Sequence, residues 1–406
     1  MLSQPALPSW AALAALVPSS TVKRPISTDW ILTPDHDSLQ SSGRLTLFRE
    51  RNGWCPYSAR LWLALELKEL DYDTVRIDTS FNGRPSFLSD ATPQIQWPDG
   101  AVQDGSVDIL FALDARYPHA PLCSVPGVSR ETIEQLIAAY HETFGGGSVV
   151  DGEPMRIEAS RVTLEAAADR TEALLAEIEG GPFFCGSSIS VVDVVWAPFL
   201  ERYASWVPFL HPNLELRRNP RWPRIAQWFD AMEECAPAYA CRLRGDPTSW
   251  WKVLAFSPGW LIPPSRGWTP PPLEFGRNGE KSSAQARSDV SAAQWTAYAS
   301  SRAHVASDAS AECAAHLIRN RQSVADDAQA ALRFPSAEQI DIPLRALTWL
   351  LSGSIVQSDA LAVKRTAGLQ ELIEFLDQRV CVPRDMGAPE AAALTRLRID
   401  LAETQL

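Results

Sequence analysis

The feature that most constrains the fold is the order of strands and helices predicted between Arg44 and Pro118. Apolar and polar residues alternate where strands are expected, and an unbroken apolar run after Cys55 predicts a buried helix. The predicted elements are, in order, a strand from Arg44, a helix after Cys55, a strand over Asp71 to Asp78, two short strands around Pro98-Asp99-Gly100, and a helix from Ser106. This order, βαβ followed by ββα, predicts an α+β fold.

The rest of the chain predicts helices. At 406 residues it exceeds the roughly 250 to 300 residues that one hydrophobic core supports, so we expect two domains and an additional region. Six prolines between Ser257 and Gly279 indicate a linker. The predicted organisation is an N-terminal extension (1–43), an α+β domain (44–120), an all-helical domain (128–255), the Pro-rich linker (256–279) and an alanine-rich helical extension (280–406).

Ser190 and Asp193 predict a strongly capped helix within the all-helical domain. The Ser190 side chain and the Asp193 carboxylate each match one half of a capping box, and Ile189 and Val194 match a hydrophobic staple. We interpret both polar residues as structural. Tryptophans of this domain are expected to fill its core, with Trp206 alternatively lining an acceptor pocket.

Charge and composition exclude several classes of function. The net charge of −12 would repel a nucleic acid backbone, and no apolar run is long enough to span a membrane. The seven cysteines are odd in number and include no CxxC pair, which suits a reducing compartment and predicts a cytoplasmic protein. No Cys/His cluster with ligand spacing accompanies His304 and His316, so no metal is predicted.

The first 27 residues fit two interpretations. They lack Asp and Glu and contain Lys23 and Arg24, a composition typical of an organelle transit peptide and hence of a chloroplast location. Alternatively, Ser9 caps a helix whose apolar residues, Trp10, Leu13 and others, pack on the body of the protein.

Cys55 lies where the first strand has ended and a helix begins, with Pro56 in its first turn. A helix N-terminus favours thiolate, so we expect the pKa of Cys55 to be lowered; an apolar core would instead leave the thiol inert. Ser58 stands where dithiol motifs have their second cysteine, so thiol exchange at this turn must be monothiol. Ser58 then donates a hydrogen bond or is simply a helix residue.

These residues resemble a known family. Trp54-Cys55-Pro56-Tyr57-Ser58, Thr92-Pro93, Asp99-Gly100 before Ser106, and Tyr117-Pro118 follow in the order and spacing of the glutathione-transferase N-terminal domain. Phe183 to Asp193 is similar to the capping-box segment of that family's helical domain. The resemblance covers roughly residues 44–245 and is greatest to the cysteine-type omega, lambda, dehydroascorbate reductase and iota classes. It implies a thioredoxin-like domain followed by the all-helical transferase domain.

The resemblance also implies roles for individual residues. Cys55 matches the catalytic thiol, Pro93 the cis-proline whose neighbour pairs with the cysteinyl backbone of glutathione, and Ser106 the serine that binds the γ-glutamyl carboxylate. Ser106 as a mere helix cap is the alternative. The implied glutathione-binding residues are Pro56, Tyr57, Ser58, Thr92, Pro93, Asp104 and Ser106. The sequence departs from the family at Gly105, where an acidic residue is usual; Asp104 lies one position earlier.

The leading hypothesis is therefore a glutathione-dependent thiol transferase or oxidoreductase acting through Cys55. Its expected partners are glutathione and a small molecule or glutathionylated protein, and the resemblance suggests a homodimer. The alternative is a non-catalytic assembly or binding protein that keeps the transferase fold, with the long C-terminal extension carrying the function.

Overall fold

The computed structural model describes residues 6–22, 26–32, 43–50, 53–77, 87–143, 161–211, 214–246, 249, 290–332 and 337–404. The chain divides into two compact units. Unit 1 combines Met1–Arg24 with Glu274–Leu406, and unit 2 is Pro25–Leu273. The predicted N-terminal extension is thus shared between the units, and the predicted linker lies outside the described residues. The finer domain boundaries stay predictions.

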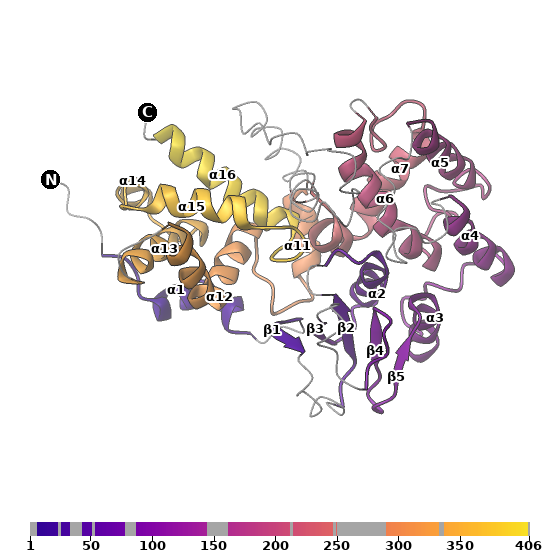
Figure 1. Cartoon of the computed structure of the whole chain (residues 1–406), viewed down its shortest axis with the longest axis horizontal. Coiled ribbons are helices and arrows are strands. Elements are labelled where there is room, and N and C mark those ends of the chain that lie inside the picture. Colours follow the sequence, from indigo (N-terminus) through magenta and orange to yellow (C-terminus); the bar gives the residue numbers. More distant parts are fainter. Residues whose placement is uncertain are drawn as a thin grey trace, which may run out of the picture. The chain divides into compact units, whose positions relative to one another are not determined.

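Unit 2 contains a five-stranded sheet in the order β1-β3-β2-β4-β5 (Figure 1). Its strands are β1 (Ile26–Leu32), β2 (Thr46–Glu50), β3 (Asp73–Ile77), β4 (Gln94–Gln96) and β5 (Val102–Asp104). β1 and β2 run parallel to β3, whereas β4 pairs antiparallel with β2 and with β5. Strands β2 to β5 confirm the thioredoxin-like order. The edge strand β1 was not predicted, because its sequence does not alternate apolar and polar residues.

Two helices of the α+β part pack with the sheet and with the helices that follow. α2 (Pro56–Leu67) begins at a proline, whose fixed φ suits the first helical position, and is buried on most of its surface. α3 (Ser106–Arg116) begins after Gly105, whose φ of 82° favours glycine. The helical part comprises α4 (Arg130–Thr143), α5 (Arg161–Leu174), α6 (Val191–Leu210) and α7 (Pro223–Cys235), and then a short π-helical turn, η3 (Tyr239–Leu243).

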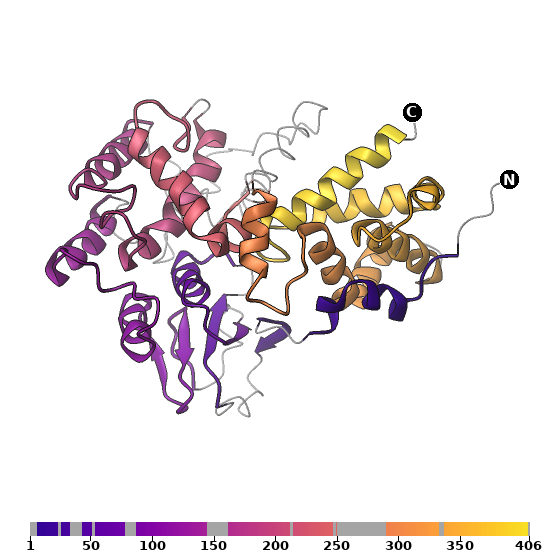
Figure 2. The same cartoon turned by 180° about the vertical axis from the view of Figure 1, so that it is seen from behind.

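One large hydrophobic core joins these layers. α2 packs directly on α6, and buried side chains from the sheet, α2, α3 and α4 to α7 belong to one cluster. Figure 2 shows the sheet and helices of this unit from behind. Trp196, Trp222 and Trp228 are buried within it, as predicted. The Trp206 side chain lies outside the described residues. The predicted capping box is present at the start of α6.

Unit 1 is helical and has its own core. Its elements are α1 (Trp10–Leu16), the 3-10 turn η1 (Pro18–Thr21), α11 (Ala292–Ala299), α12 (Ala309–Leu332), α13 (Ala337–Leu351), α14 (Gln357–Lys364), α15 (Leu369–Arg379) and α16 (Ala388–Thr404). α11 and α12 are separate helices within the predicted helical extension. Asp308 begins the second, since its carboxylate accepts from the N–H of Ala311 at 2.8 Å.

The N-terminal segment is an integral part of unit 1. Ser9 caps α1, as the second interpretation of this segment predicted. The Trp10 indole donates to Asp341 at 2.7 Å, and Arg345 donates to the carbonyl of Pro8 at 3.2 Å. Leu13 is 0% exposed and lies in the same cluster as α12 and α13. Residues 6–22 therefore act as a strap that completes this core.

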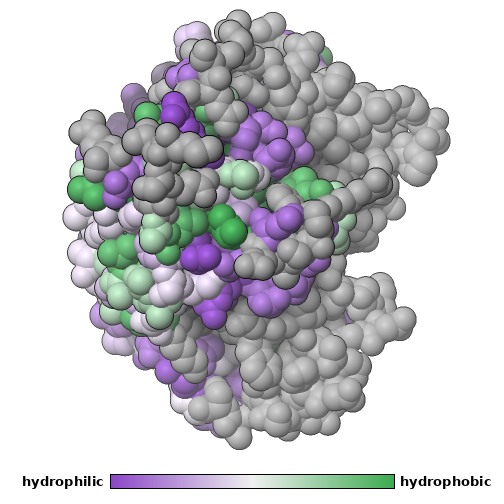
Figure 3. Space-filling view, turned by 90° about the vertical axis from the view of Figure 1, so that its left-hand side faces the viewer, coloured by the Kyte–Doolittle hydropathy of each residue, from purple (hydrophilic) through white to green (hydrophobic). Residues whose placement is uncertain are grey.

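Replacing Leu13 by alanine should destabilise unit 1 by about 2 to 5 kcal/mol, because it leaves a cavity beneath the strap. Leu16 is the matched control, being the same residue type on the same helix but 41% exposed, so Leu16→Ala should change stability by less than about 0.5 kcal/mol. Chemical denaturation of both variants measures the difference. Equal losses of stability in the two variants would show that burial of Leu13 does not stabilise the core of this unit. On the face of the molecule seen in Figure 3, apolar side chains, in green, are interspersed with hydrophilic ones, in purple.

Candidate functional site

Cys55 occupies the N-cap position of α2, directly after the turn that follows β2. The carboxylate of Glu50, at the end of β2, accepts hydrogen bonds from the backbone N–H groups of Trp54 at 2.8 Å and Cys55 at 3.3 Å. The thiol is half-buried and lies 3.9 Å from the carbonyl oxygen of Thr92. The Thr92-Pro93 peptide bond is cis. The structure thus brings Cys55 and Thr92-Pro93 together from segments 37 residues apart.

The electrostatics of Cys55 differ from the prediction. Burial raises the pKa of the thiol, and this outweighs the lowering by the Ser58 hydroxyl and N–H. Glu50 raises the pKa further, whereas Arg202 lowers it. The predicted lowering of the Cys55 pKa by the helix N-terminus is therefore wrong for the protein without a bound substrate. Ser58 nevertheless lies where it stabilises a thiolate.

The raised pKa predicts a pH profile for the reactivity of Cys55. Only the thiolate reacts with iodoacetamide, so a thiol with a raised pKa is mostly protonated at neutral pH. The alkylation rate at Cys55 should keep rising from pH 7 through pH 9, by about tenfold for each unit below the pKa. Peptide mapping by mass spectrometry measures the rate at this cysteine. A plateau reached below pH 7 would show that the pKa is lowered instead.

Pro56, Tyr57 and Ser58, which follow Cys55 in the predicted motif, form the first turn of α2. Pro56 is the first residue of α2, and the Tyr57 ring packs edge-on against Phe199 of α6, with ring centres 5.8 Å apart. Ser58 is buried beneath Cys55 in the first turn of the helix. The helical domain therefore contacts the turn that carries Cys55 through α6.

Asp104, Gly105 and Ser106 form the other predicted part, where β5 leads into α3. Ser106 is not the helix cap, because Gly105 holds that position and no side chain caps the helix there. The Ser106 hydroxyl is buried and accepts from the Arg60 guanidinium at 3.4 Å. Asp104 is exposed and accepts a hydrogen bond from Ser89 at 2.6 Å. A ligand amino group would have to share the Asp104 carboxylate with Ser89.

Three charged residues of the site were missed by sequence reasoning: Glu50, Arg60 and Arg202. Arg202 lies on α6 and donates to the backbone carbonyl of Trp54, next to Cys55. The charged pair Glu201-Arg202 interrupts an apolar helix, which was a usable sequence signal. No local sequence pattern marks Glu50 or Arg60 as a site residue, because their contacts depend on the tertiary structure.

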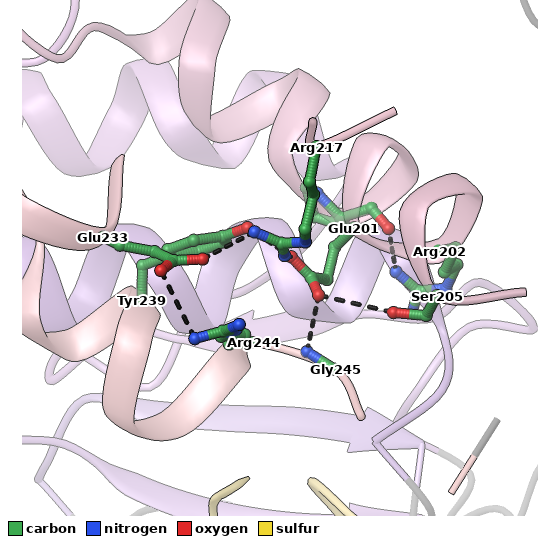
Figure 4. Close-up of polar contacts among 9 residues, drawn as sticks. Glu201, Arg202, Ser205, Arg217, Glu233, Tyr239, Arg244 and Gly245 are labelled. Atoms are coloured by element: carbon green, nitrogen blue, oxygen red, sulfur yellow. Dashed lines mark hydrogen bonds and ion pairs between the residues drawn. The ribbon is translucent and has the colours of Figure 1, made fainter. Parts of the chain in front are cut away.

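The neighbour of Arg202 anchors this part of α6. The Glu201 carboxylate accepts from Arg217 at 2.5 Å, from Tyr239 and from the N–H of Gly245 at 2.9 Å (Figure 4). Arg217 also binds Glu233 of α7 at 2.5 Å. These contacts join α6, α7 and η3, so they fix the stretch of α6 from which Arg202 reaches the turn at Trp54.

Family models match both halves of unit 2. Residues 54–116 match the glutathione S-transferase N-terminal domain, and residues 154–231 match its C-terminal domain. The chain contains a glutathione S-transferase module. The first match spans Cys55, Thr92-Pro93 and Ser106, and the second contains the capping box of α6 and Arg202. The predicted family resemblance is confirmed.

Individual relatives are similar to part of this chain. Glutathione S-transferase L1 of Arabidopsis thaliana is 28% identical over 44% of this chain and 75% of its own length. Glutathione S-transferase DHAR2 of the same plant is 29% identical over 36% of this chain and 66% of its own length. The crystal structure of glutathione transferase Omega 3C from Trametes versicolor superposes with a TM-score of 0.40 and 18% identity, covering 56% of this chain and 88% of the transferase.

None of the helices that the structure describes is long and apolar enough to cross a membrane. Within the described ranges, no three His, Cys, Asp or Glu side chains are grouped so as to hold a metal ion.

Proposed function

We propose that the transferase module is a glutathione-dependent thiol transferase in which Cys55 is the single reacting thiol. The observation that carries the proposal is the half-buried Cys55 thiol at the start of α2, facing the carbonyl of Thr92 before the cis peptide bond. The matches to the transferase domains and to relatives named glutathione S-transferase support glutathione as the thiol substrate.

The reaction proceeds through one mixed disulfide. The Cys55 thiolate attacks the glutathionyl sulfur of a glutathionylated substrate, which forms a Cys55–glutathione disulfide and releases the substrate thiolate to take up a proton. A second glutathione, as thiolate, attacks the glutathionyl sulfur of that disulfide. This step yields oxidised glutathione and restores the Cys55 thiolate. No second cysteine of the motif takes part, because Ser58 occupies the position where dithiol motifs have it.

The site residues have three roles in this mechanism. Ser58 and Arg202 stabilise the thiolate against the effect of burial, since both lower the pKa of Cys55. The backbone at Thr92 pairs with the cysteinyl unit of glutathione, while Ser106 and the N-terminus of α3 bind its γ-glutamyl carboxylate. Pro56 and Tyr57 shape the turn, and Asp104 binds the glutathione amino group.

An assay of the purified protein with two substrates tests this proposal. A glutathione mixed disulfide should be reduced at the expense of glutathione, whereas conjugation of glutathione to a standard aromatic electrophile should be slower. Rapid conjugation without disulfide reduction would contradict the thiol-transferase assignment. A homodimer and a cytoplasmic or chloroplast location stay predictions.

A non-catalytic binding or assembly protein is the second candidate. Two observations favour it: burial raises the pKa of Cys55, and Asp104 is engaged by Ser89. Failure of the protein to turn over either substrate in the assay above, while it still binds glutathione, would support this candidate.

A further inference from the structure

Arg60 is a buried cation in the middle of unit 2. Arg60 is 1% exposed. Its guanidinium carbon lies 4.7 Å from the ring centres of Tyr57 and Tyr140 and 5.1 Å from the ring centre of Phe199. Its Nε donates to the carbonyl of Val195 at 3.0 Å. Among the residues that the structure describes, Arg60 has no carboxylate partner, and its Nη2 donates no hydrogen bond.

A buried guanidinium without an anion is unusual. Arginine remains protonated in proteins, and an uncompensated buried charge costs several kcal/mol, on the order of 3 to 5 when a partner is removed. Aromatic rings offset part of this cost through cation–π contacts. The part of this cost that the rings do not offset favours binding of an anion close to Arg60.

The contact between Arg60 and Ser106 indicates where that anion lies. A guanidinium can only donate hydrogen bonds, so the Ser106 oxygen must act as the acceptor in the 3.4 Å contact. The hydroxyl proton of Ser106 is then left to donate away from Arg60. Ser106 is the first residue of α3, whose N-terminus has no capping side chain. The hydroxyl proton, the N-terminus of α3 and the charge of Arg60 all favour a negative group at this end of the helix, where the one acidic residue of the first turn is Asp108.

We propose that Arg60 is a positioning residue for the γ-glutamyl carboxylate of glutathione, acting through the Ser106 hydroxyl. This inference rests on the proposed function, which places that carboxylate at the N-terminus of α3. Arg60 does not touch the ligand. It orients and polarises the hydroxyl that does, and it supplies the positive charge that the bound carboxylate compensates.

Two peptides separate this role from a structural one. Glutathione carries the γ-glutamyl α-carboxylate, whereas γ-aminobutyryl-cysteinyl-glycine lacks only that group and keeps the amine, the thiol and the glycyl carboxylate. Calorimetry on the full chain should show that the parent prefers glutathione. Arg60→Gln should reduce this preference by about tenfold or more, because a hydrogen bond to a charged group is worth about 1.5 to 3 kcal/mol. Arg60→Lys, which keeps the charge, should retain part of it.

Arg49 provides the matched control. It is likewise buried, at 2% exposed, and lies 4.6 Å from the ring centre of Trp62, but the structure shows no contact between it and Ser106. Arg49→Gln should leave the preference between the two peptides unchanged, whatever its effect on stability. If Arg60→Gln weakens both peptides equally, or neither, the assignment of Arg60 is wrong although the proposed function stands.

Ser106→Ala keeps the inference testable if Arg60→Gln does not fold. It should reduce the preference for glutathione, and Arg60→Lys added to it should cause no further reduction, since the two residues act in series. Independent, additive losses would overturn the relay through Ser106. A parent protein that binds neither peptide would instead contradict the proposed function itself, and with it the role of Arg60.

Discussion

Cys55→Ser should abolish thiol exchange while leaving glutathione binding within a fewfold of the parent. The serine hydroxyl fits the same position before α2, but it cannot form a mixed disulfide with glutathione. Turnover of a glutathione mixed disulfide should fall by a factor of about 10³ or more, to the background level, because the reacting atom is gone. Conjugation to an electrophile should persist or rise, since a serine at this turn can donate to the bound glutathione thiolate.

The matched control for this variant is Cys235→Ser. Cys235 is exposed on α7 and has no place in the proposed site, so its loss should leave turnover unchanged. Thiol exchange that survives in Cys55→Ser would remove Cys55 from the mechanism. Loss of glutathione binding as well as turnover in the variant would show that the thiol contributes to ligand affinity.

Asp193→Ala should lower the free energy of unfolding of unit 2 more than a helix cap alone implies. The Asp193 carboxylate is 0% exposed and accepts four hydrogen bonds: from the N–H and hydroxyl of Ser190, each at 2.8 Å, from the N–H of Phe184 at 3.1 Å and from the Trp228 indole at 2.8 Å. A cap is worth about 0.5 to 2 kcal/mol. Two further buried donors left unpaired, at about 1 to 3 kcal/mol each, raise the expected loss to about 3 to 5 kcal/mol.

Gln294 in unit 1 offers the matched control for that variant. It completes the capping box of α11 with Ser291, but both residues lie at the surface of their helix. Gln294→Ala should therefore cost no more than about 1 kcal/mol. Denaturant titration monitored by tryptophan fluorescence compares the two. A similar small loss for Asp193→Ala would show that Phe184 and Trp228 find other partners, and a fall in turnover without a loss of stability would place Asp193 in the site.

Sequence reasoning predicted the parts of this fold that local pattern controls. The strands β2 to β5, the start of α2 at Pro56, and the capping box of Ser190 and Asp193 follow from alternation, helix-start residues and reciprocal hydrogen bonding over a few positions. The family resemblance added Thr92-Pro93 and Ser106 to Cys55. The structure places Cys55 beside Thr92, and the binding and catalytic roles of these residues stay predictions.

The tertiary structure decided the charges around those residues. The pKa of Cys55 depends on how deeply the thiol is buried and on Arg202, which is 147 positions away in the sequence, so the local helix N-terminus predicted the wrong direction. The strap of residues 6–22 likewise belongs to unit 1 because its apolar residues complete a core built from the C-terminal helices. The sequence by itself determined most of the helices and strands and the position of the thiol at the start of α2. Only packing decided desolvation and long-range charge pairing, because both depend on atoms brought together from distant parts of the chain.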